Sequence, residues 1–462
     1  MTVETRSYEL KEIQGDMMTP ISIYHALNGK KKTLFESSAK HEESGRYSFI
    51  ACNPIAEITG NQSGYSLLYE SGSQEKGTES IIEKLKSMMP IHKETYPFSF
   101  FGGAIGYFGY ETAFYSEKIG EFLHDDLEMP DIHLMFYDTF VIYDHLKQTA
   151  TIAAIDLFHN GRTQNKMTEA IEAICSDLKK GPISSKENEA KLAFQPMIDE
   201  QTFIEMVQKA KEHIIKGDIF QVVLSQRFSS PYEGNPFALY RKLRTSNPSP
   251  YMFYLDFEHY IILGTSPESL VKVQNGLVTT NPIAGTKPRG QSIQEDEQIA
   301  KDLLNDEKEV AEHRMLVDLG RNDIGRISEI GSVSIEKYMK IEYYKYVMHI
   351  VSEVTGLLKK DTHVLDVLSA CLPAGTVSGA PKIRAMQIIN QLETSKRGVY
   401  AGAVGYISIT GNMDLALAIR TMVVKDQVAH VQAGAGIVFD SIPKSEYEET
   451  LNKAKALLEV QR

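Results

Sequence analysis

The sequence contains no tryptophan and only three cysteines among its 462 residues. The cysteines are far apart, odd in number and never spaced as CxxC, which excludes a disulfide framework and a thiolate metal site. No stretch approaches the roughly 18 consecutive apolar residues that a membrane-spanning helix needs. The first residues, MTVETRSYELKEI, lack the apolar core of a signal peptide. We therefore expect a cytoplasmic protein that does not interact with a membrane.

Positive charge is also scarce, because 49 Lys and Arg face 61 Asp and Glu, for a net charge of −12. A protein that binds the nucleic-acid backbone needs a concentrated basic surface, so we expect no nucleic-acid partner. Hydrophobic residues make up 42% of the chain, which is enough for a sizeable core. If the protein binds an anionic substrate, its cations must be placed locally.

Short strand-like segments and amphipathic helices alternate along the chain, and tight turns such as Gly411-Asn412 join some of the strands. This pattern predicts an α/β protein of the α+β type, with mixed, largely antiparallel sheets forming a two-layer sandwich and helices around it. The polar segment 181–198 is the best linker candidate. It separates an N-terminal region, 1–180, from a C-terminal region, 199–462.

Three long segments carry specific predictions. Leu134–Tyr143 and Asp414–Val424 are each rich in apolar residues and are each predicted to form one strand. Arg420 lies in the second of these strands, where its charge needs an anion or a carboxylate partner, so a salt bridge and a ligand contact are both open. Asp302–Leu319 has an apolar stripe at helical spacing and is predicted to form one helix.

Two pairs of glutamates are spaced three residues apart, Glu309 with Glu312 and Glu446 with Glu449. That spacing places each pair on one face of a helix. Two such faces that meet would supply the oxygen ligands that Mg²⁺ prefers. Solvated helix faces have the same pattern, so the spacing alone leaves both interpretations open.

Three glycine-rich turns, at 283–290, 373–380 and 432–438, suit a carboxylate or a phosphate, because glycine lets backbone amides approach a ligand. Taken singly, such turns are more often purely structural. None of them completes a dinucleotide loop or a P-loop. His349, in the apolar run YVMHIVS, is by itself more typical of a core histidine than of a catalyst.

Nine motifs nevertheless occur in an order that resembles the chorismate-utilising enzymes, most closely those that form anthranilate. The motifs are VVLSQR (222–227), SPES (266–269), PIAGTKPRG (282–290), EKEVAEHRMLVDLGRND (307–323), VMHIVSEVTG (347–356), PAGTVSGAPKIRAM (373–386), YAGAVGY (400–406), AIRTM (418–422) and QAGAGIVFDSIPKSEYEET (432–450). The resemblance covers most of residues 200–460. A weaker N-terminal match rests on LFESS (34–38) and GRYSFI (45–50).

The resemblance implies that the substrate is the dianion chorismate, held partly through Mg²⁺. The implied Mg²⁺ ligands are Glu312 and Glu449, with Glu309 and Glu446 close by or holding waters. The implied substrate-binding residues are Gly285, Thr286, Tyr400, Arg420, Gly434, Ala435, Gly436 and Lys453. Among these, Arg420 and Tyr400 match the residues that hold the enolpyruvyl side.

The resemblance also implies catalytic roles. Glu268 matches the general acid that protonates the leaving C4 hydroxyl, His349 matches the residue used for pyruvate elimination, and Thr376 lies in a loop that positions the substrate. Relatives that add water carry lysine where this chain has Gln221, and many aminodeoxychorismate synthases carry lysine where it has Ala284. Both differences favour ammonia as the nucleophile and anthranilate as the product. Aminodeoxychorismate synthase component I is the alternative.

The N-terminal half resembles the tryptophan-sensing part of the family. The implied inhibitor-site residues are Glu36, Ser37, Pro250, Tyr251 and Met252. A plain contact between domains is the alternative for these positions, since relatives without regulation keep a similar pocket. No GxCxG nucleophile is present, so the resemblance implies a separate glutamine amidotransferase subunit that delivers ammonia, and we expect a hetero-oligomer.

Overall fold

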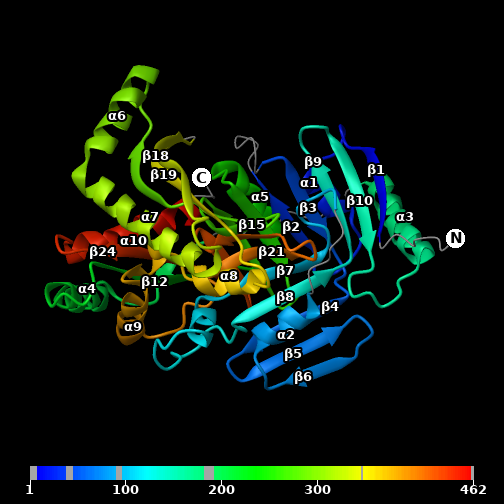
Figure 1. Ribbon diagram of the computed structural model, residues 1–462, viewed down its shortest axis with the longest axis horizontal. Helices are drawn as coiled ribbons and strands as arrows, with labels where there is room; N and C mark the ends of the chain where they lie inside the picture. Colours follow the sequence, from blue (N-terminus) through cyan, green and yellow to red (C-terminus); the bar gives the residue numbers. More distant parts are fainter. Residues whose placement is uncertain (1–7, 38–44, 90–95, 182–191, 345–346, 459–462) are drawn as a thin grey trace.

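The strands of the chain form two large sheets that face each other (Figure 1). The computed structural model describes residues 8–37, 45–89, 96–181, 192–344 and 347–458. Within these ranges each sheet has 12 strands, and the ladders between the strands are antiparallel. Antiparallel pairing agrees with the short turns and hairpins in the sequence.

The strands of the first sheet follow one another in the order β1 (Tyr8–Gln14), β10 (Thr149–Ile155), β9 (Thr139–Asp144), β3 (Tyr47–Ala51), β2 (Thr33–Glu36), β13 (Tyr251–Asp256), β14 (Tyr260–Ser266), β23 (Thr421–Lys425), β24 (Val428–Ile437), β12 (Gln221–Pro231) and β11 (Gln195–Pro196), with β20 (Gly379–Ala380) also paired to β12. The second sheet has the order β17 (Ile283–Pro288), β19 (Val347–Leu357), β16 (Leu277–Thr280), β15 (Ser269–Gln274), β22 (Met413–Leu417), β21 (Ala403–Ser408), β7 (Gly103–Phe108), β8 (Ile132–Tyr137), β4 (Ala56–Asn61), β5 (Gly64–Tyr69) and β6 (Gln74–Gly77), with β18 (Ser334–Tyr343) paired to β19.

A hydrophobic core lies between the two sheets. Phe253 and Ile262 of the first sheet belong to the same buried cluster as Ile105 and Leu415 of the second. Packing of two sheets through their inner faces is the arrangement of a sandwich. The predicted fold class, largely antiparallel sheets in a two-layer sandwich with surrounding helices, is confirmed.

The helices cover the outer faces and the ends of the sandwich (Figure 1). They are α1 (Pro20–Ala26), α2 (Ile81–Met88), α3 (Gln164–Lys180), α4 (Glu200–Ile215), α5 (Pro236–Ser246), α6 (Ile293–Asn305), α7 (Glu307–Ile327), α8 (Val364–Cys371), α9 (Lys382–Leu392) and α10 (Pro443–Leu458), with 3₁₀ turns η1 (Tyr110–Tyr115) and η2 (Gly375–Val377). A second core cluster lies under α1, α3 and α5, and a third under α4, α9 and α10. Within the described ranges, no helix is both long enough and apolar enough to cross a membrane.

Two predicted strands are each divided between the sheets. Leu134–Tyr143 becomes β8 in the second sheet and β9 in the first, and Asp414–Val424 becomes β22 in the second and β23 in the first. The second break contains Arg420, whose φ of 47° is left-handed and interrupts the extended backbone. The prediction of single strands is wrong at these places, and Arg420 lies where the chain crosses between layers.

The predicted single helix Asp302–Leu319 is also two helices, α6 and α7, which meet at Asp306. The carboxylate of Asp306 accepts hydrogen bonds from the backbone N–H groups of Lys308 at 3.1 Å and Glu309 at 3.3 Å. Such an N-cap starts a new helix rather than continuing the old one. The junction of α6 and α7 at Asp306 therefore sets the direction of the helix that carries Glu309 and Glu312.

Strands from both sides of the predicted linker share both sheets. In the first sheet β2 pairs with β13, and in the second β7 pairs with β21. Of the predicted linker 181–198, residues 182–191 lie outside the described residues, and its last part contains β11, which pairs with β12. The division into a regulatory region, 1–180, and a catalytic region, 199–462, stays a prediction about function.

Candidate active site

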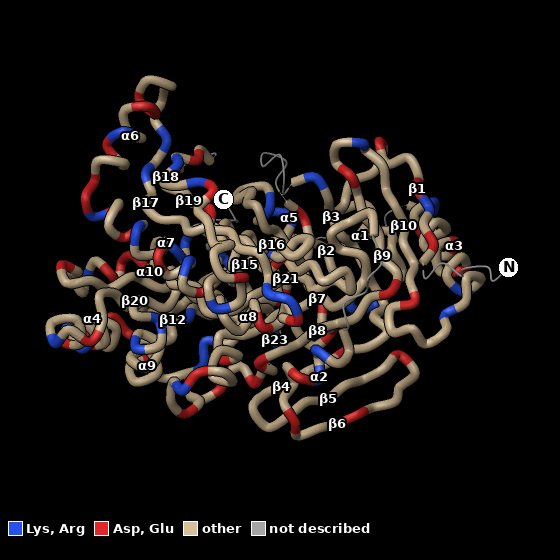
Figure 2. The backbone as a smooth tube through the Cα atoms, in the orientation of Figure 1, with Lys and Arg blue, Asp and Glu red and all other residues tan. Residues whose placement is uncertain are grey.

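The two glutamate pairs lie on the helices α7 and α10, which carry acidic segments near one another (Figures 1 and 2). Glu309, Glu312, Glu446 and Glu449 are all half-buried, whereas the neighbouring Lys308 is exposed. Lys308 on α7 interacts electrostatically with Glu446 on α10. Solvated helix faces would leave these glutamates as exposed as Lys308. Their burial therefore favours a shared site over that alternative.

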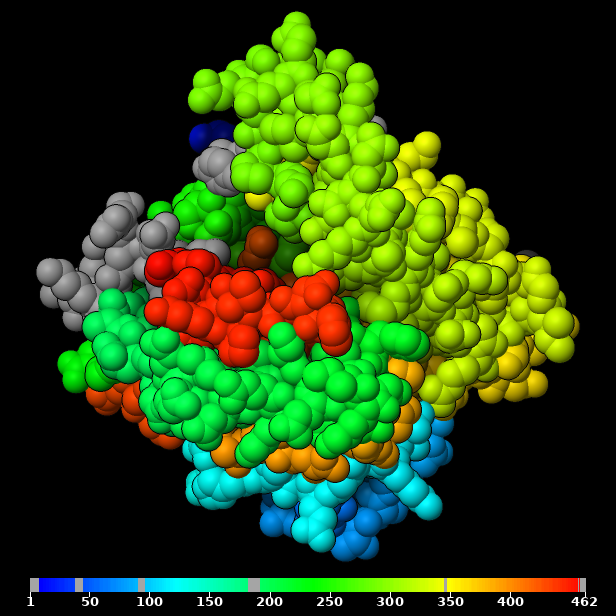
Figure 3. Space-filling model, turned by 90° about the vertical axis from the view of Figure 1, so that its left-hand side faces the viewer, coloured from blue at the N-terminus to red at the C-terminus, as the bar shows by residue number. Residues whose placement is uncertain are grey.

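The ends of β12 and β24 form the floor beside α10, where Figure 3 shows a hollow in the surface. Gln221 Nε2 donates to Glu312 Oε1 at 3.4 Å. A Cβ on Gly436 would lie 2.7 Å from this amide nitrogen, and a Cβ on Gly434 would lie 2.8 Å from the Tyr400 hydroxyl. Only glycine lets these side chains lie so close to the strand, and it leaves the backbone accessible to a ligand.

Lys453 connects this floor to α10. Its Nζ lies 2.7 Å from Glu449 Oε1 and donates to the Gly434 carbonyl at 3.1 Å. The side chain of Ala435, by contrast, belongs to the core under α4 and α10. Only the backbone of Ala435 can therefore contribute to substrate binding.

The strands β17 and β19 form the opposite wall, with Thr286 paired to His349. Thr286 Oγ1 lies 3.0 Å and the Gly285 carbonyl oxygen 3.3 Å from His349 Nδ1. Gly285 has a φ of 63°, and a Cβ there would lie 3.2 Å from Glu309 Oε2. Burial lowers the pKa of His349 to about 4, so the ring is neutral at physiological pH.

Glu268 lies at the end of the site, immediately before β15. It is 8% exposed, and its Oε1 accepts a hydrogen bond from the Thr376 hydroxyl at 2.8 Å. Burial raises the pKa of Glu268 to about 7, against the opposing effects of Thr376 and of the positive charges of Arg420 and Lys453. A carboxyl group with that pKa keeps its proton near neutral pH, as a general acid requires.

Arg420 faces this end of the site from the crossover between the sheets. Burial lowers its pKa, and the neighbouring Glu268 and Tyr344 side chains oppose the shift. Its guanidinium forms no hydrogen bond or ion pair with any residue that the structure describes. An unpaired cation in a half-buried position is costly, so this geometry favours an anionic ligand over a salt bridge.

The carboxylates of α7 and α10 have the chemistry of a Mg²⁺ site without forming a compact one. Among the described residues, no three His, Cys, Asp or Glu side chains come together as a metal-binding group. Burial and then the charge of Glu312 raise the pKa of Glu309, and burial together with Glu449 raises that of Glu446. A bound cation would relieve this repulsion, and oxygen ligands suit Mg²⁺. The residues present fit such an ion.

A second cavity of about 310 Å³ lies between β2, β3 and β13 of the first sheet and β15, β21 and β22 of the second. Ser37, Pro250 and Tyr251, which the resemblance implies for an inhibitor site, line this cavity. Its remaining lining residues include the aromatic Tyr47, Phe49, Phe98 and Tyr406 and the charged Lys272 and Asp414. Ser37 Oγ and Asp414 Oδ1 are buried without a hydrogen-bond partner among the described residues.

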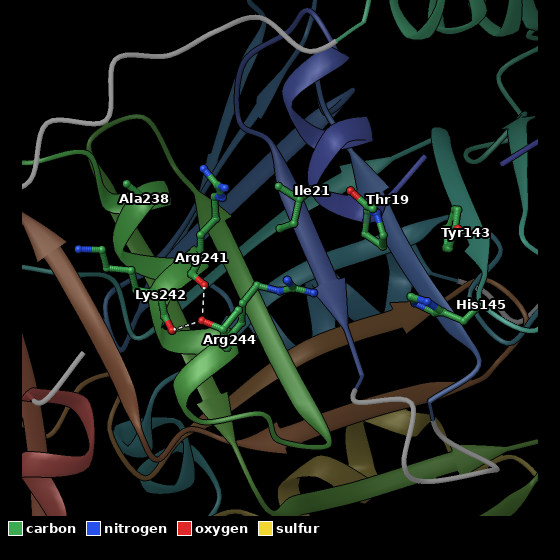
Figure 4. Close-up of a pocket in the computed structure, with 10 residues that line it drawn as sticks. Thr19, Ile21, Tyr143, His145, Ala238, Arg241, Lys242 and Arg244 are labelled. Atoms are coloured by element: carbon green, nitrogen blue, oxygen red, sulfur yellow. Dashed lines mark hydrogen bonds between the residues drawn. The ribbon is translucent and has the colours of Figure 1, made fainter. Parts of the chain in front are cut away.

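Two other predicted inhibitor-site residues are placed differently. Glu36 lines the cavity, but its carboxylate accepts hydrogen bonds from Tyr240 at 2.7 Å and from Arg244 at 2.8 Å. Arg244 in turn lines a separate cavity of about 610 Å³ between α1, α5 and the end of β9 (Figure 4). Met252 is 4% exposed and packs in the core cluster under α5, because neighbouring side chains of β13 point to opposite faces.

Sequence reasoning missed two residues at these sites. Asp414 lies in an apolar strand pattern, where a single acid attracts no attention, yet it contributes an unpaired carboxylate oxygen to the second cavity. Tyr344 lies beside the catalytic candidates, with its ring centroid 5.2 Å from that of His349. The only sequence signal for Asp414 is a charge within an otherwise buried strand, and nothing in the sequence singles out Tyr344.

The fold agrees with comparisons against known proteins. The family model of the chorismate binding enzymes matches residues 30–459, so the chain belongs to that family. The chain is 48% identical to anthranilate synthase component 1 of Lactococcus lactis, over 98% of this chain and 99% of that one. It is 46% identical to the same component of Acetivibrio thermocellus, over 97% and 93%.

Solved structures give the same result. Anthranilate synthase component I from Streptococcus pneumoniae has a TM-score of 0.83 and 45% identity, with 96% of this chain and 98% of that chain covered. The menaquinone-specific isochorismate synthase from Escherichia coli has a TM-score of 0.73 and 18% identity, over 99% and 95%, which shows a shared fold.

Proposed function

We propose that this chain converts chorismate and ammonia into anthranilate, pyruvate and water, as the component I half of a two-subunit enzyme. The choice of reaction rests on positions 221 and 284, because neither residue has an amine. Gln221 presents an amide next to Glu312, and position 284 is alanine. An amide cannot activate water as a base, and a methyl group cannot attack the ring. The nucleophile must therefore enter as a separate molecule, and ammonia supplies the amino group of the product.

The two carboxylates of chorismate have complementary partners in the site. The Arg420 guanidinium, which has no hydrogen-bond or ion-pair partner among the described residues, can bind one carboxylate through two parallel hydrogen bonds. The resemblance implies that Tyr400 binds on the same side. The turn at Gly285 and Thr286 and the exposed backbone at Gly434–Gly436 can hold the other. Mg²⁺ bound by Glu312 and Glu449, with Glu309 and Glu446 nearby, would neutralise that carboxylate and withdraw electrons from the ring.

Glu268 supplies the proton for the first step. As ammonia forms the new bond at C2, the bond from C4 to its hydroxyl group breaks, and the Glu268 proton converts the leaving hydroxide into water. Thr376 keeps the carboxyl group in place by donating to Oε1 at 2.8 Å. The added ammonium group then releases a proton, so the overall reaction needs no external acid.

His349 acts in the second step, in which it removes the C2 proton, the bond from C3 to the enolpyruvyl oxygen breaks, and the methylene carbon of the leaving group takes up a proton to give pyruvate. Because the Gly285 carbonyl can only accept a hydrogen bond, Nδ1 carries the ring proton and Nε2 is the basic nitrogen. Thr286 fixes the ring from the same side at 3.0 Å. Loss of the C2 proton makes the ring aromatic, which drives the elimination.

The cavity that contains Ser37 and Asp414 fits a regulatory amino acid, and tryptophan is the inhibitor that we propose. Its volume of about 310 Å³ and its aromatic lining suit an indole ring. The unpaired oxygens of Ser37 and Asp414 suit the polar groups of an amino acid. The carboxylate of Glu36 is already bound by Arg244 and Tyr240, so we assign it to holding the cavity wall rather than to ligand recognition.

The source of ammonia is a partner glutamine amidotransferase subunit, because the sequence has no GxCxG nucleophile of its own. The test of the proposed function is product identification with the purified chain, chorismate, Mg²⁺ and an ammonium salt at alkaline pH. Anthranilate with one pyruvate per turnover supports the proposal. A product that keeps its pyruvyl group and carries the amino group at C4 would show aminodeoxychorismate synthase activity instead.

A further inference from the structure

A small cavity of about 40 Å³ lies beside Glu268, between β15, α7 and η2. Glu268, Thr376 and Asp323 all line it. A water molecule needs roughly 10–15 Å³ of such space, so the cavity has room for two or three waters. Ser269 and Thr280 add hydroxyl groups to its wall, and such polar partners are what a buried water requires.

Asp323, on α7, connects this cavity to the surface. Its Oδ2 accepts a hydrogen bond from Lys382 Nζ at 2.6 Å, and Lys382 also donates to the Cys371 carbonyl at 3.3 Å. Oδ1 of Asp323 has no hydrogen-bond partner among the described residues. The side chains of Asp323 and Lys382 are 17% and 10% exposed. A water in the cavity can therefore reach an open carboxylate oxygen that is itself close to solvent.

Glu268 needs such a connection, because it loses a proton in every turnover. After the C4 hydroxyl leaves as water, Glu268 is an anion that is 8% exposed and close to Arg420 and Lys453. The proton released by the new ammonium group lies on the substrate side. A bound substrate covers that side, so return of a proton from solvent requires another route.

We propose that Asp323 returns protons to Glu268 through water held in the 40 Å³ cavity. In each cycle the Asp323 carboxylate takes up a proton from solvent and passes it to a water, that water gives a proton to the Glu268 carboxylate, and Asp323 returns to its ion pair with Lys382. One proton therefore enters from solvent, and the ammonium group on the ring releases one proton to solvent, so the cycle balances. Asp323 acts through water and not on the substrate, and its proton delivery rests on the proposed function.

The titratable groups around Asp323 and Glu268 allow this proton transfer. Burial raises the pKa of Asp323, while the positive charges of Lys382 and Arg326 oppose the shift. Burial raises the pKa of Cys371 to about 12, so the thiol stays neutral. The other charged or titratable groups near Glu268 are Arg420, Lys453 and Tyr344. None of these lines the cavity among the residues described there, which leaves Asp323 as its acidic relay.

The test compares D323N, D323E and K382M with the wild-type chain, using chorismate, Mg²⁺ and an ammonium salt. D323N removes the proton but keeps the shape, so kcat should fall about tenfold, less than for loss of the acid itself, and KM for chorismate should stay near its wild-type value. The solvent deuterium isotope effect on kcat should rise, and the alkaline fall in kcat should begin at a lower pH. D323E should restore most of kcat.

K382M is the structural control, because it breaks the same ion pair and keeps the carboxylate. If Asp323 only ties α7 to α9, D323N and K382M will lose kcat and thermal stability equally, with an unchanged isotope effect, and the proposal is overturned. Should D323N fail to fold, a proton inventory of the wild-type chain decides: a curved plot supports a water relay, and a straight one contradicts it. Absence of product from the wild-type chain would instead refute the proposed function.

Discussion

Replacing Glu268 with glutamine (E268Q) should make the protein more stable above pH 7 while removing most of its activity. The ordinary pKa of a glutamate is 4.5, and burial raises that of Glu268 to about 7. Between these values the folded protein keeps a proton that the unfolded chain has released. Wild-type stability therefore falls as the pH rises from 4.5, and the loss is complete above about pH 7.

The size of the loss follows from the same values. A rise from 4.5 to about 7 corresponds to about 3 kcal/mol, since each pKa unit is worth roughly 1.4 kcal/mol. The glutamine side chain has no charge to bury and can still accept the Thr376 hydrogen bond. E268Q should therefore gain about 3 kcal/mol over the wild type at pH 8.5 and little at pH 4.5, while kcat falls by roughly 10²–10⁴-fold.

Urea denaturation of both proteins across this pH range measures the difference directly. E448Q is the matched control, because Glu448 lies on α10 and is exposed. It should show no pH-dependent gain. A constant difference in unfolding free energy between E268Q and the wild type from pH 4.5 to 8.5 would refute the assignment of Glu268 as a buried acid that is protonated near neutral pH.

Three further predictions concern other parts of the protein. H349N should accumulate the aminated ring that still carries its enolpyruvyl group, seen by chromatography; complete conversion to anthranilate at the wild-type rate would exclude His349 as the base. E312Q should raise the Mg²⁺ concentration for half-maximal activity at least tenfold, because one charged ligand is lost, and an unchanged Mg²⁺ titration would remove Glu312 from the site. D414N should weaken tryptophan inhibition about tenfold with kcat unchanged, since a hydrogen bond to a charged group contributes roughly 1.5–3 kcal/mol; an unaltered inhibition curve would contradict the role given to Asp414.

The sequence predicted the fold class and the family because long motifs and strand periodicity report local structure. The places where the chain passes from one sheet to the other were not predicted from the sequence. Asp414–Val424 has the apolar content of one strand, yet it passes from the second sheet to the first at Arg420, with a φ of 47°. Periodicity cannot show that change of sheet, because both strands are buried and similar in composition. Because Arg420 lies at this crossover and not within a strand, its guanidinium can face the site.

The motifs predicted which residues belong to the candidate site, but not what surrounds them. Glu268 contacts Thr376, and Thr286 contacts His349, which are residues that the resemblance names. The environment that sets their pKa values depends on burial, which spacing does not report. Asp323 belongs to a recognised motif, but its closeness to Glu268 arises from the packing of α7 against η2, so only the structure makes it a candidate.

The most direct test of the account is to identify what the purified chain makes from chorismate, Mg²⁺ and ammonium at alkaline pH. Fluorescence and mass spectrometry should show 2-aminobenzoate, and a coupled assay should show an equal amount of pyruvate. Formation of isochorismate, or of an aminated ring without pyruvate, would contradict the reaction derived from Gln221, Ala284 and Glu268.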